Sequence, residues 1–111
     1  MIDYSDFEKV DMRLGTIIEV ERHSKAKKPA YILKIDFGDE IGIKTSSAQL
    51  VTAYTEEELM NRKVVAVINL ESKNVAGVLS EVLVLGLPTE DEKVCLVEPV
   101  KFDIKNGARL Y

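Results

Sequence analysis

The chain has 111 residues, of which 46% are hydrophobic and 31% are charged, and it carries a net charge of −4. This length fits a single domain over residues 1–111, and the composition is that of an ordinary globular protein. The acidic balance argues against a protein that coats nucleic acid without specificity, although a local basic patch is compatible with it.

The first 45 residues predict a short helix and three strands. Apolar residues recur at every third position within residues 3–11, and Ser5 with Glu8 fits a capping box, which indicates a short N-terminal helix. Apolar and polar residues then alternate in three segments, which is the pattern of half-buried strands. These predicted strands cover residues 14–22, 31–37 and 41–45. The alternation places Tyr31 and Phe37 in the core.

The middle of the chain predicts a second short helix and a pair of strands. Thr55 and Glu58 fit another capping box at the start of this helix. Strands are expected over residues 63–70 and 78–86, joined by a polar link over residues 71–77. Because the first of these strands is apolar on both faces, we expect it to be central or covered on both sides.

The order of the elements favours an all-β fold with a small α content. A short strand is expected over residues 94–97, and a turn signal at Asn106–Gly107 predicts a small hairpin in the tail. Three strands, a short helix and two more strands fit a five-stranded barrel of the OB type, with the helix between strands three and four. A β-sandwich is the main alternative, but it would need about seven strands. The N- and C-terminal extensions, about residues 1–12 and 98–111, either plug the barrel or meet a second copy of the chain.

Catalysis has little support in the sequence. The six glycines are scattered and form no phosphate-binding loop, and no hydrolase or deaminase motif is present. His23 is the only histidine and lies in a lysine-rich loop, so we expect it to be exposed. Cys95 is the only cysteine, which excludes an internal disulfide and argues against a Cys/His zinc site. We therefore expect a protein that is not an enzyme and needs no cofactor or metal.

The sequence also bears on the compartment. No apolar run approaches the ~20 residues of a membrane span. The N-terminus lacks the basic and apolar regions of a signal peptide. We therefore expect a cytoplasmic protein without membrane insertion.

Binding is better supported than catalysis. An OB barrel commonly presents one sheet face and its rim loops to an oligomeric ligand, often nucleic acid. The candidate phosphate-binding residues are Lys25, Lys27, Lys28, Lys34, Lys44 and Lys73. Lysine–phosphate contacts give affinity and salt dependence without reading sequence. Each lysine alone fits an ordinary solvated surface better, whereas the clustering of residues 25–28 makes a binding site an equal alternative.

Several blocks of the sequence resemble a known family. Asp11-Met-Arg-Leu-Gly15 resembles the D-x-R-x-G entry of the tRNA-binding OB domain. That domain occurs as a stand-alone bacterial protein and as an appendage of methionyl- and tyrosyl-tRNA synthetases. Residues 42–49, 64–69 and 76–86 look most like its CsaA branch, small cytoplasmic proteins described as export-related chaperones.

The resemblance implies an OB barrel that forms a symmetric homodimer, with tRNA or another structured RNA as its ligand. By position in the motif it adds Asn69 and Ser80 to the candidate RNA contacts. In tRNA-binding members the link is rich in lysine and arginine and the next strand begins S-x-G-M, but here residues 71–74 hold one base and one acid, and Glu81 follows Ser80.

The CsaA branch implies a different ligand, unfolded preprotein segments bound for export. The acidic net charge and the reduced basic link favour this alternative. The candidate peptide-groove or dimer residues are Ile43, Ser46, Ser47, Gln49, Glu81, Leu83 and Phe102. RNA binding ranks first, this chaperone function is the alternative, and a structural or assembly domain without a ligand is a third interpretation.

Overall fold

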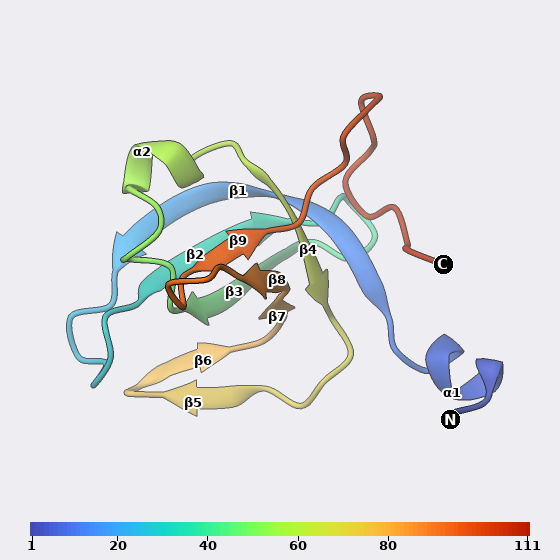
Figure 1. The fold of residues 1–111 in the computed structure, drawn as a ribbon, viewed down its shortest axis with the longest axis horizontal. Coiled ribbons are helices and arrows are strands. Elements are labelled where there is room, and N and C mark those ends of the chain that lie inside the picture. The colour runs from blue at the N-terminus through green and yellow to red at the C-terminus, as the bar shows by residue number, and fades with distance from the viewer.

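The computed structural model describes the whole chain, residues 1–111, and its body is a five-stranded antiparallel sheet that curls into a barrel (Figure 1). The order across the sheet is β3-β2-β1-β4-β7. The five strands are β1 (Met12–Arg22), β2 (Tyr31–Asp36), β3 (Ile43–Ala48), β4 (Lys63–Val67) and β7 (Leu83–Val84). Beside β7, the Glu81 N–H donates to the Thr45 carbonyl of β3 at 2.8 Å. The two sheet edges therefore nearly close, which confirms the predicted barrel of the OB type.

Four shorter strands and two short helices complete the fold. They are β5 (Lys73–Val75), β6 (Val78–Ser80), β8 (Gly86–Pro88), β9 (Val94–Leu96), α1 (Tyr4–Glu8) and α2 (Glu56–Leu59). Strand β5 pairs with β6, and β8 pairs with β9. Helix α2 lies between β3 and β4, as predicted. Neither helix has the length and apolar character that crossing a bilayer would require.

The predicted strand pair over residues 63–70 and 78–86 is only partly correct. Strand β4 is shorter than predicted, and the second segment is divided among β6, β7 and β8. The predicted polar link contains β5, because Ala76 (φ 47°) and Gly77 (φ 90°) adopt left-handed conformations that turn the chain directly into β6. The strand then breaks at Glu81, whose main chain bonds to β3, before β7 pairs with β4.

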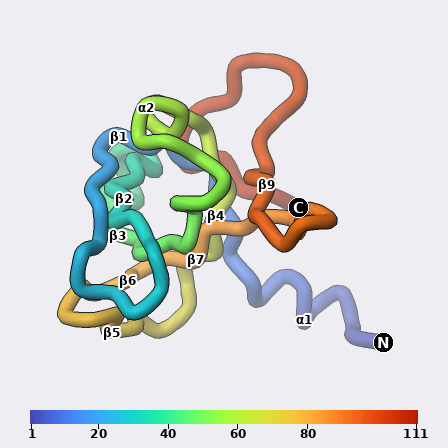
Figure 2. Tube along the Cα trace, turned by 60° about the vertical axis from the view of Figure 1, so that its left-hand side comes forward, coloured from blue at the N-terminus to red at the C-terminus, as the bar shows by residue number.

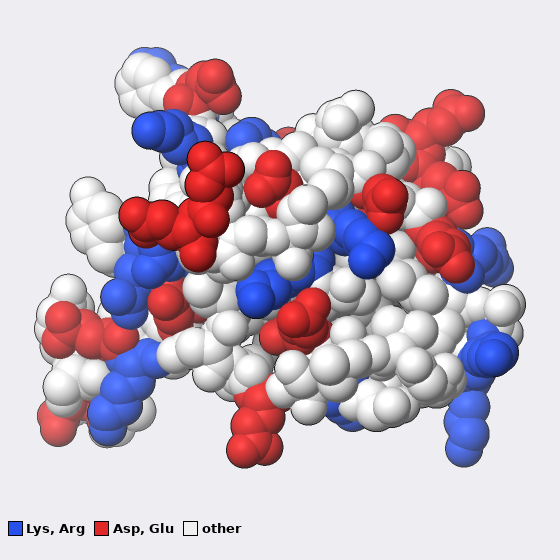
Figure 3. All heavy atoms as spheres, turned by 180° about the vertical axis from the view of Figure 1, so that it is seen from behind, with Lys and Arg blue, Asp and Glu red and all other residues white.

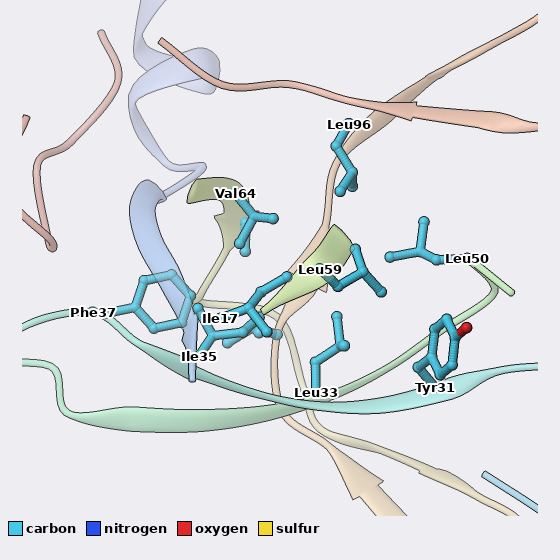
Figure 4. Close-up of a cluster of buried hydrophobic side chains, with 11 residues drawn as sticks. Ile17, Tyr31, Leu33, Ile35, Phe37, Leu50, Leu59, Val64 and Leu96 are labelled. Atoms are coloured by element: carbon cyan, nitrogen blue, oxygen red, sulfur yellow. The ribbon is translucent and has the colours of Figure 1, made fainter. Parts of the chain in front are cut away.

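The core fills the barrel and follows the alternation of β2. Tyr31, Leu33, Ile35 and Phe37 are buried, as predicted, whereas Lys34 is exposed. Figure 4 shows these four side chains gathered with others from β1, β4 and α2. Burying a large apolar side chain contributes roughly 1.5–3 kcal/mol. The register of β2 is therefore strongly specified, because a slip of one residue would expose all four side chains.

Both helices begin with a side chain bonded to the main chain. At α2 the predicted capping box is present: the Thr55 N–H donates to Glu58 Oε1 at 2.9 Å, and the Glu58 N–H donates to Thr55 Oγ1 at 3.2 Å. At α1 the Asp3 N–H donates to Asp6 Oδ2 at 3.2 Å, two residues before the predicted box. Aspartate is a strong N-cap residue, so the earlier start is favourable. Figures 1 and 2 show α1 projecting away from the barrel.

The C-terminal tail runs along β1, and the predicted tail hairpin is wrong. The turn at Asn106–Gly107 forms, but the Leu14 N–H of β1 then donates to the Ala108 carbonyl at 2.9 Å. Strand β2 pairs only with residues 16–22 of β1, so the start of β1 has free main-chain groups that the tail satisfies. The tail also covers the outer side of β4, where Val65 lines an apolar groove of about 280 Å³. Strand β4 is thus central and covered on both faces, as predicted.

Candidate nucleic-acid interface

The loop between β1 and β2, here called the lysine loop (residues 24–29), carries three exposed lysines. They are Lys25, Lys27 and Lys28. The His23 N–H donates to the Ala30 carbonyl at 2.9 Å and closes the loop. Figures 1 and 2 both show the loop beside the β5–β6 hairpin, on which Lys73 is also exposed. Four of the predicted phosphate-binding lysines therefore lie on two neighbouring elements at one end of the barrel.

The two strand lysines, Lys34 and Lys44, do not share a face. Lys34 stands opposite Thr45 on β3 and opposite Glu19 on β1, so it lies on the outer face of the sheet beside a carboxylate. Lys44 stands opposite the buried Ile35, so its side chain lies on the same face of the sheet as Ile35 and on the opposite face from Lys34. A ligand lying on one face of the sheet contacts only one of these lysines, and Glu19 weakens the attraction of Lys34 for phosphate.

His23 departs from its predicted environment. The sequence predicts an exposed imidazole, but the residue is only 5% exposed. Its Nδ1 lies 3.1 Å from Ser47 Oγ on β3, and its Nε2 is buried without a hydrogen-bond partner. The prediction failed because the composition of a loop does not report the direction of a single side chain within it.

The contact between β3 and residues 80–82, here called the seam, is made largely by side chains. Its side-chain bonds are Ser47 N–H to Ser80 Oγ (3.0 Å), Thr45 N–H to Glu81 Oε1 (3.0 Å) and Ser46 Oγ to Val82 O (3.1 Å). Side-chain oxygens thus satisfy main-chain donors along an edge of β3 that lacks a full strand partner. The candidate RNA contact Ser80 and the candidate groove residues Ser46, Ser47 and Glu81 are brought together here.

The remaining candidate groove residues divide between two places. Ile43 and Leu83 are 55% and 51% exposed; Ile43 lies at the start of β3, and Leu83 directly follows residue 82, where the seam ends. Gln49 is exposed just after β3. Phe102 is 77% exposed on the tail, where Lys101 Nζ lies 5.1 Å from its ring centroid. The tail projects on the side away from the lysine loop (Figures 1 and 2), so these residues do not form one surface.

Asn69 holds the N-terminal segment against the end of β4. Its Oδ1 accepts from the Asp11 N–H at 2.9 Å, and its Nδ2 donates to the Lys9 carbonyl at 2.7 Å. Asp11 in turn accepts from Arg13 Nε at 2.6 Å and lies 3.6 Å from Arg109 Nε. The Asp-x-Arg pattern therefore joins both chain ends to the barrel. This role could not be predicted from the pattern, because the partners Asn69 and Arg109 lie far away in the sequence.

Asp11→Asn is expected to destabilise the fold near neutral pH and to lose this effect in acid. The hydrogen bond from Arg13 holds the pKa of Asp11 below its ordinary value. The carboxylate therefore contributes its full stability above the unfolded pKa of about 4, and the contribution disappears as the pH falls through the lower folded pKa. Losing the charged acceptor costs about 1.5 kcal/mol. Urea unfolding of both proteins between about pH 7 and pH 2 measures the difference, and a pH-independent difference would contradict the expectation.

The surface charges are mixed rather than concentrated. Figure 3 shows acidic and basic side chains interspersed over the face seen from behind, without a large area of either sign. No group of three or more His, Cys, Asp or Glu side chains is placed to hold a metal ion. With a net charge of −4, attraction for phosphate depends on local groups such as the lysine loop rather than on the whole molecule.

Comparisons of sequence and of structure with known proteins point to the same family. Residues 12–109 match the family described as "Putative tRNA binding domain". The chain is 42% identical over 109 residues to methionine–tRNA ligase of Pyrococcus abyssi and 34% identical over 107 residues to that of Flavobacterium psychrophilum. These matches cover 98% and 96% of the chain but only 14% and 15% of those much longer proteins.

Three solved structures match this chain over its full length. The CsaA chaperone protein of Picrophilus torridus is 49% identical with a TM-score of 0.91, and each chain is covered completely. Chaperone CsaA of Bacillus anthracis is 42% identical with a TM-score of 0.92, covering 100% of this chain and 99% of that one. A MetRS-related protein of Pyrococcus horikoshii is 32% identical with a TM-score of 0.87, covering 100% and 98%. On these matches, the chain belongs to the tRNA-binding domain family.

Proposed function

We propose that this chain is a non-catalytic binding protein whose ligand is tRNA or another structured RNA. The observation that carries the proposal is the placement of the lysine loop beside the β5–β6 hairpin at one end of the barrel. Barrels of the OB type use a sheet face and the loops at its rim to bind oligonucleotides. The family match and the methionine–tRNA ligase relatives support tRNA as the kind of RNA.

The exposed lysines suit contacts to the RNA backbone. Each ammonium group that contacts a phosphate releases condensed counterions, so affinity falls with salt by a slope of about 0.7 to 0.9 per contact. Tyr31 and Phe37 are buried and do not offer rings for base stacking. The exposed rings of Tyr4 and Phe102 lie on α1 and on the tail, away from the lysine loop. The proposed recognition therefore depends on the shape and backbone of a folded RNA more than on its exposed bases.

We also propose that the functional unit is a homodimer in the cytoplasm. Apolar side chains at both chain ends are largely exposed, including Ile2 (72%), Tyr4 (69%) and Phe102 (77%). Packing these ends against a second copy would remove them from water. A two-fold axis would also double the lysine groups available to one RNA.

A titration with total tRNA at low salt tests the proposal. We expect saturable filter binding, and light scattering that reports two chains per particle before tRNA is added. The absence of saturable binding would overturn the RNA-binding proposal. A single chain per particle would overturn the dimer alone.

A second candidate function is the binding of unfolded preprotein segments for export. Two of the similar solved structures carry the name CsaA chaperone. Ile43 at the start of β3 and Leu83 directly after the seam offer exposed apolar side chains. An extended peptide recognised at a strand edge places alternate side chains on such apolar positions.

Leu83→Asp is expected to weaken the suppression of client aggregation if this second function holds. A charge at this position would remove apolar surface from the proposed peptide site. Leu70→Asp is a matched control, because Leu70 is equally exposed (53%) but lies beyond the end of β4. Light scattering of a chemically unfolded client during refolding is the measurement. Equal suppression by the wild type and Leu83→Asp would place the peptide site elsewhere.

A further inference from the structure

Three side chains form a polar bridge from the lysine loop to the β5–β6 hairpin. His23 stands at the base of the loop, and its Nδ1 lies 3.1 Å from Ser47 Oγ on β3. The Ser47 N–H donates to Ser80 Oγ on β6 at 3.0 Å. Ser80 is directly opposite Lys73 in the hairpin. The bridge therefore links the two elements that carry the exposed lysines through one residue of β3.

The bridge attaches the base of the lysine loop to β3. Within the loop, the main-chain bonds are His23 N–H to Ala30 O and Ala26 N–H to His23 O, at 2.9 Å and 3.3 Å. These bonds close the loop on itself but do not attach it to β3. The imidazole makes that attachment, and the His23 residue is only 5% exposed.

The chemistry of His23 also argues against a purely packing role. Its Nε2 is buried without a partner, and an unsatisfied buried polar atom costs free energy. An apolar side chain would fill the same volume without that cost. The polar ring is thus explained by its bond to Ser47, which a leucine or valine cannot make.

We propose that His23, Ser47 and Ser80 form a positioning device that sets the spacing between the lysine loop and Lys73, so that both contact one RNA backbone. The inference rests on the proposed RNA-binding function. Holding both groups in place before binding reduces the conformational entropy that complex formation would otherwise cost. It also makes the second set of contacts effectively intramolecular.

The test combines variants with measured salt dependence. His23→Ala is expected to weaken tRNA binding on the order of tenfold and to lower the salt slope by about one unit. Ser47→Ala removes the same hydrogen bond, so the double variant should bind no worse than either single variant. His23→Asn, which retains a polar group near the Nδ1 position, should restore much of the affinity and slope.

A second double-mutant cycle separates a positioning role of the bridge from a general effect on stability. If the bridge brings the two lysine groups together, Lys73→Ala should cost less affinity in the His23→Ala background than in the wild type. Ser46→Ala is the control, because it breaks a buried bond of β3 to Val82 without touching the bridge. It should lower stability but leave the salt slope unchanged.

Amide hydrogen exchange measured without RNA tests the bridge independently of the proposed RNA binding. His23→Ala should speed exchange at Ala26, whose N–H is bonded within the loop. Wild type that fails to bind tRNA would overturn the RNA-binding proposal, and this inference with it. Wild type that binds tRNA while His23→Ala keeps the same affinity, salt slope and exchange rates would overturn the bridge alone.

Discussion

Gly15→Val is expected to lower the free energy of unfolding by about 3 kcal/mol, the upper end of the usual cost of overpacking a core. A Cβ atom at Gly15 would stand 2.6 Å from Ile35 Cγ2 and 2.8 Å from two ring carbons of Phe37. Both neighbours are buried in the barrel core and have little room to move. The glycine of the D-x-R-x-G pattern is therefore required by the close approach of β1 to the core side chains of Ile35 and Phe37.

Guanidinium unfolding at one fixed protein concentration measures this effect, since any dimer makes stability depend on concentration. Glu19→Val is the matched control, because it places the same side chain at an exposed position of the same strand. That variant should change stability by no more than about 0.5 kcal/mol. Similar stability of Gly15→Val and wild type would show that the core relaxes around the added side chain.

The barrel was predictable because its strands are marked by local patterns. Alternation in β2 identified Tyr31 and Phe37 as core residues, and the capping box at Thr55 placed α2 correctly. The order of elements then left few topologies to consider. The tail was mispredicted for the opposite reason. Its partner is the start of β1, and a turn signal such as Asn106–Gly107 does not specify which distant strand the chain meets after the turn.

The charged surface of the site could be predicted from the sequence, but the hydrogen bonds between its distant residues could not. Exposure of Lys25, Lys27, Lys28 and Lys73 follows from their chemistry, since lysine is rarely buried. The bonds of Ser80 to β3 and of Asn69 to the N-terminal segment join residues far apart in the chain. Local patterns carry no information about such pairs, so both residues were assigned to RNA from motif position alone, and that role stays a prediction.

The combined replacement of Lys25, Lys27 and Lys28 with alanine is expected to lower tRNA affinity about 100-fold at 0.1 M salt. Three phosphate contacts at a slope of about 0.7 each amount to about two logarithmic units between 0.1 M and 1 M salt. The slope of log affinity against log salt should accordingly fall by about two. Filter-binding titrations at several salt concentrations measure both quantities.

The matched control removes three lysines from other parts of the molecule, namely Lys9 on the N-terminal segment, Lys93 between β8 and β9, and Lys105 on the tail. All three are exposed, and the change in net charge is the same. A protein that attracts RNA only through its overall field would lose equal affinity in both triple variants. A protein that binds through the lysine loop would lose slope only in the first, because only contacts with phosphate release counterions. Equal slopes in both variants would therefore contradict the interface proposed for the loop and the β5–β6 hairpin.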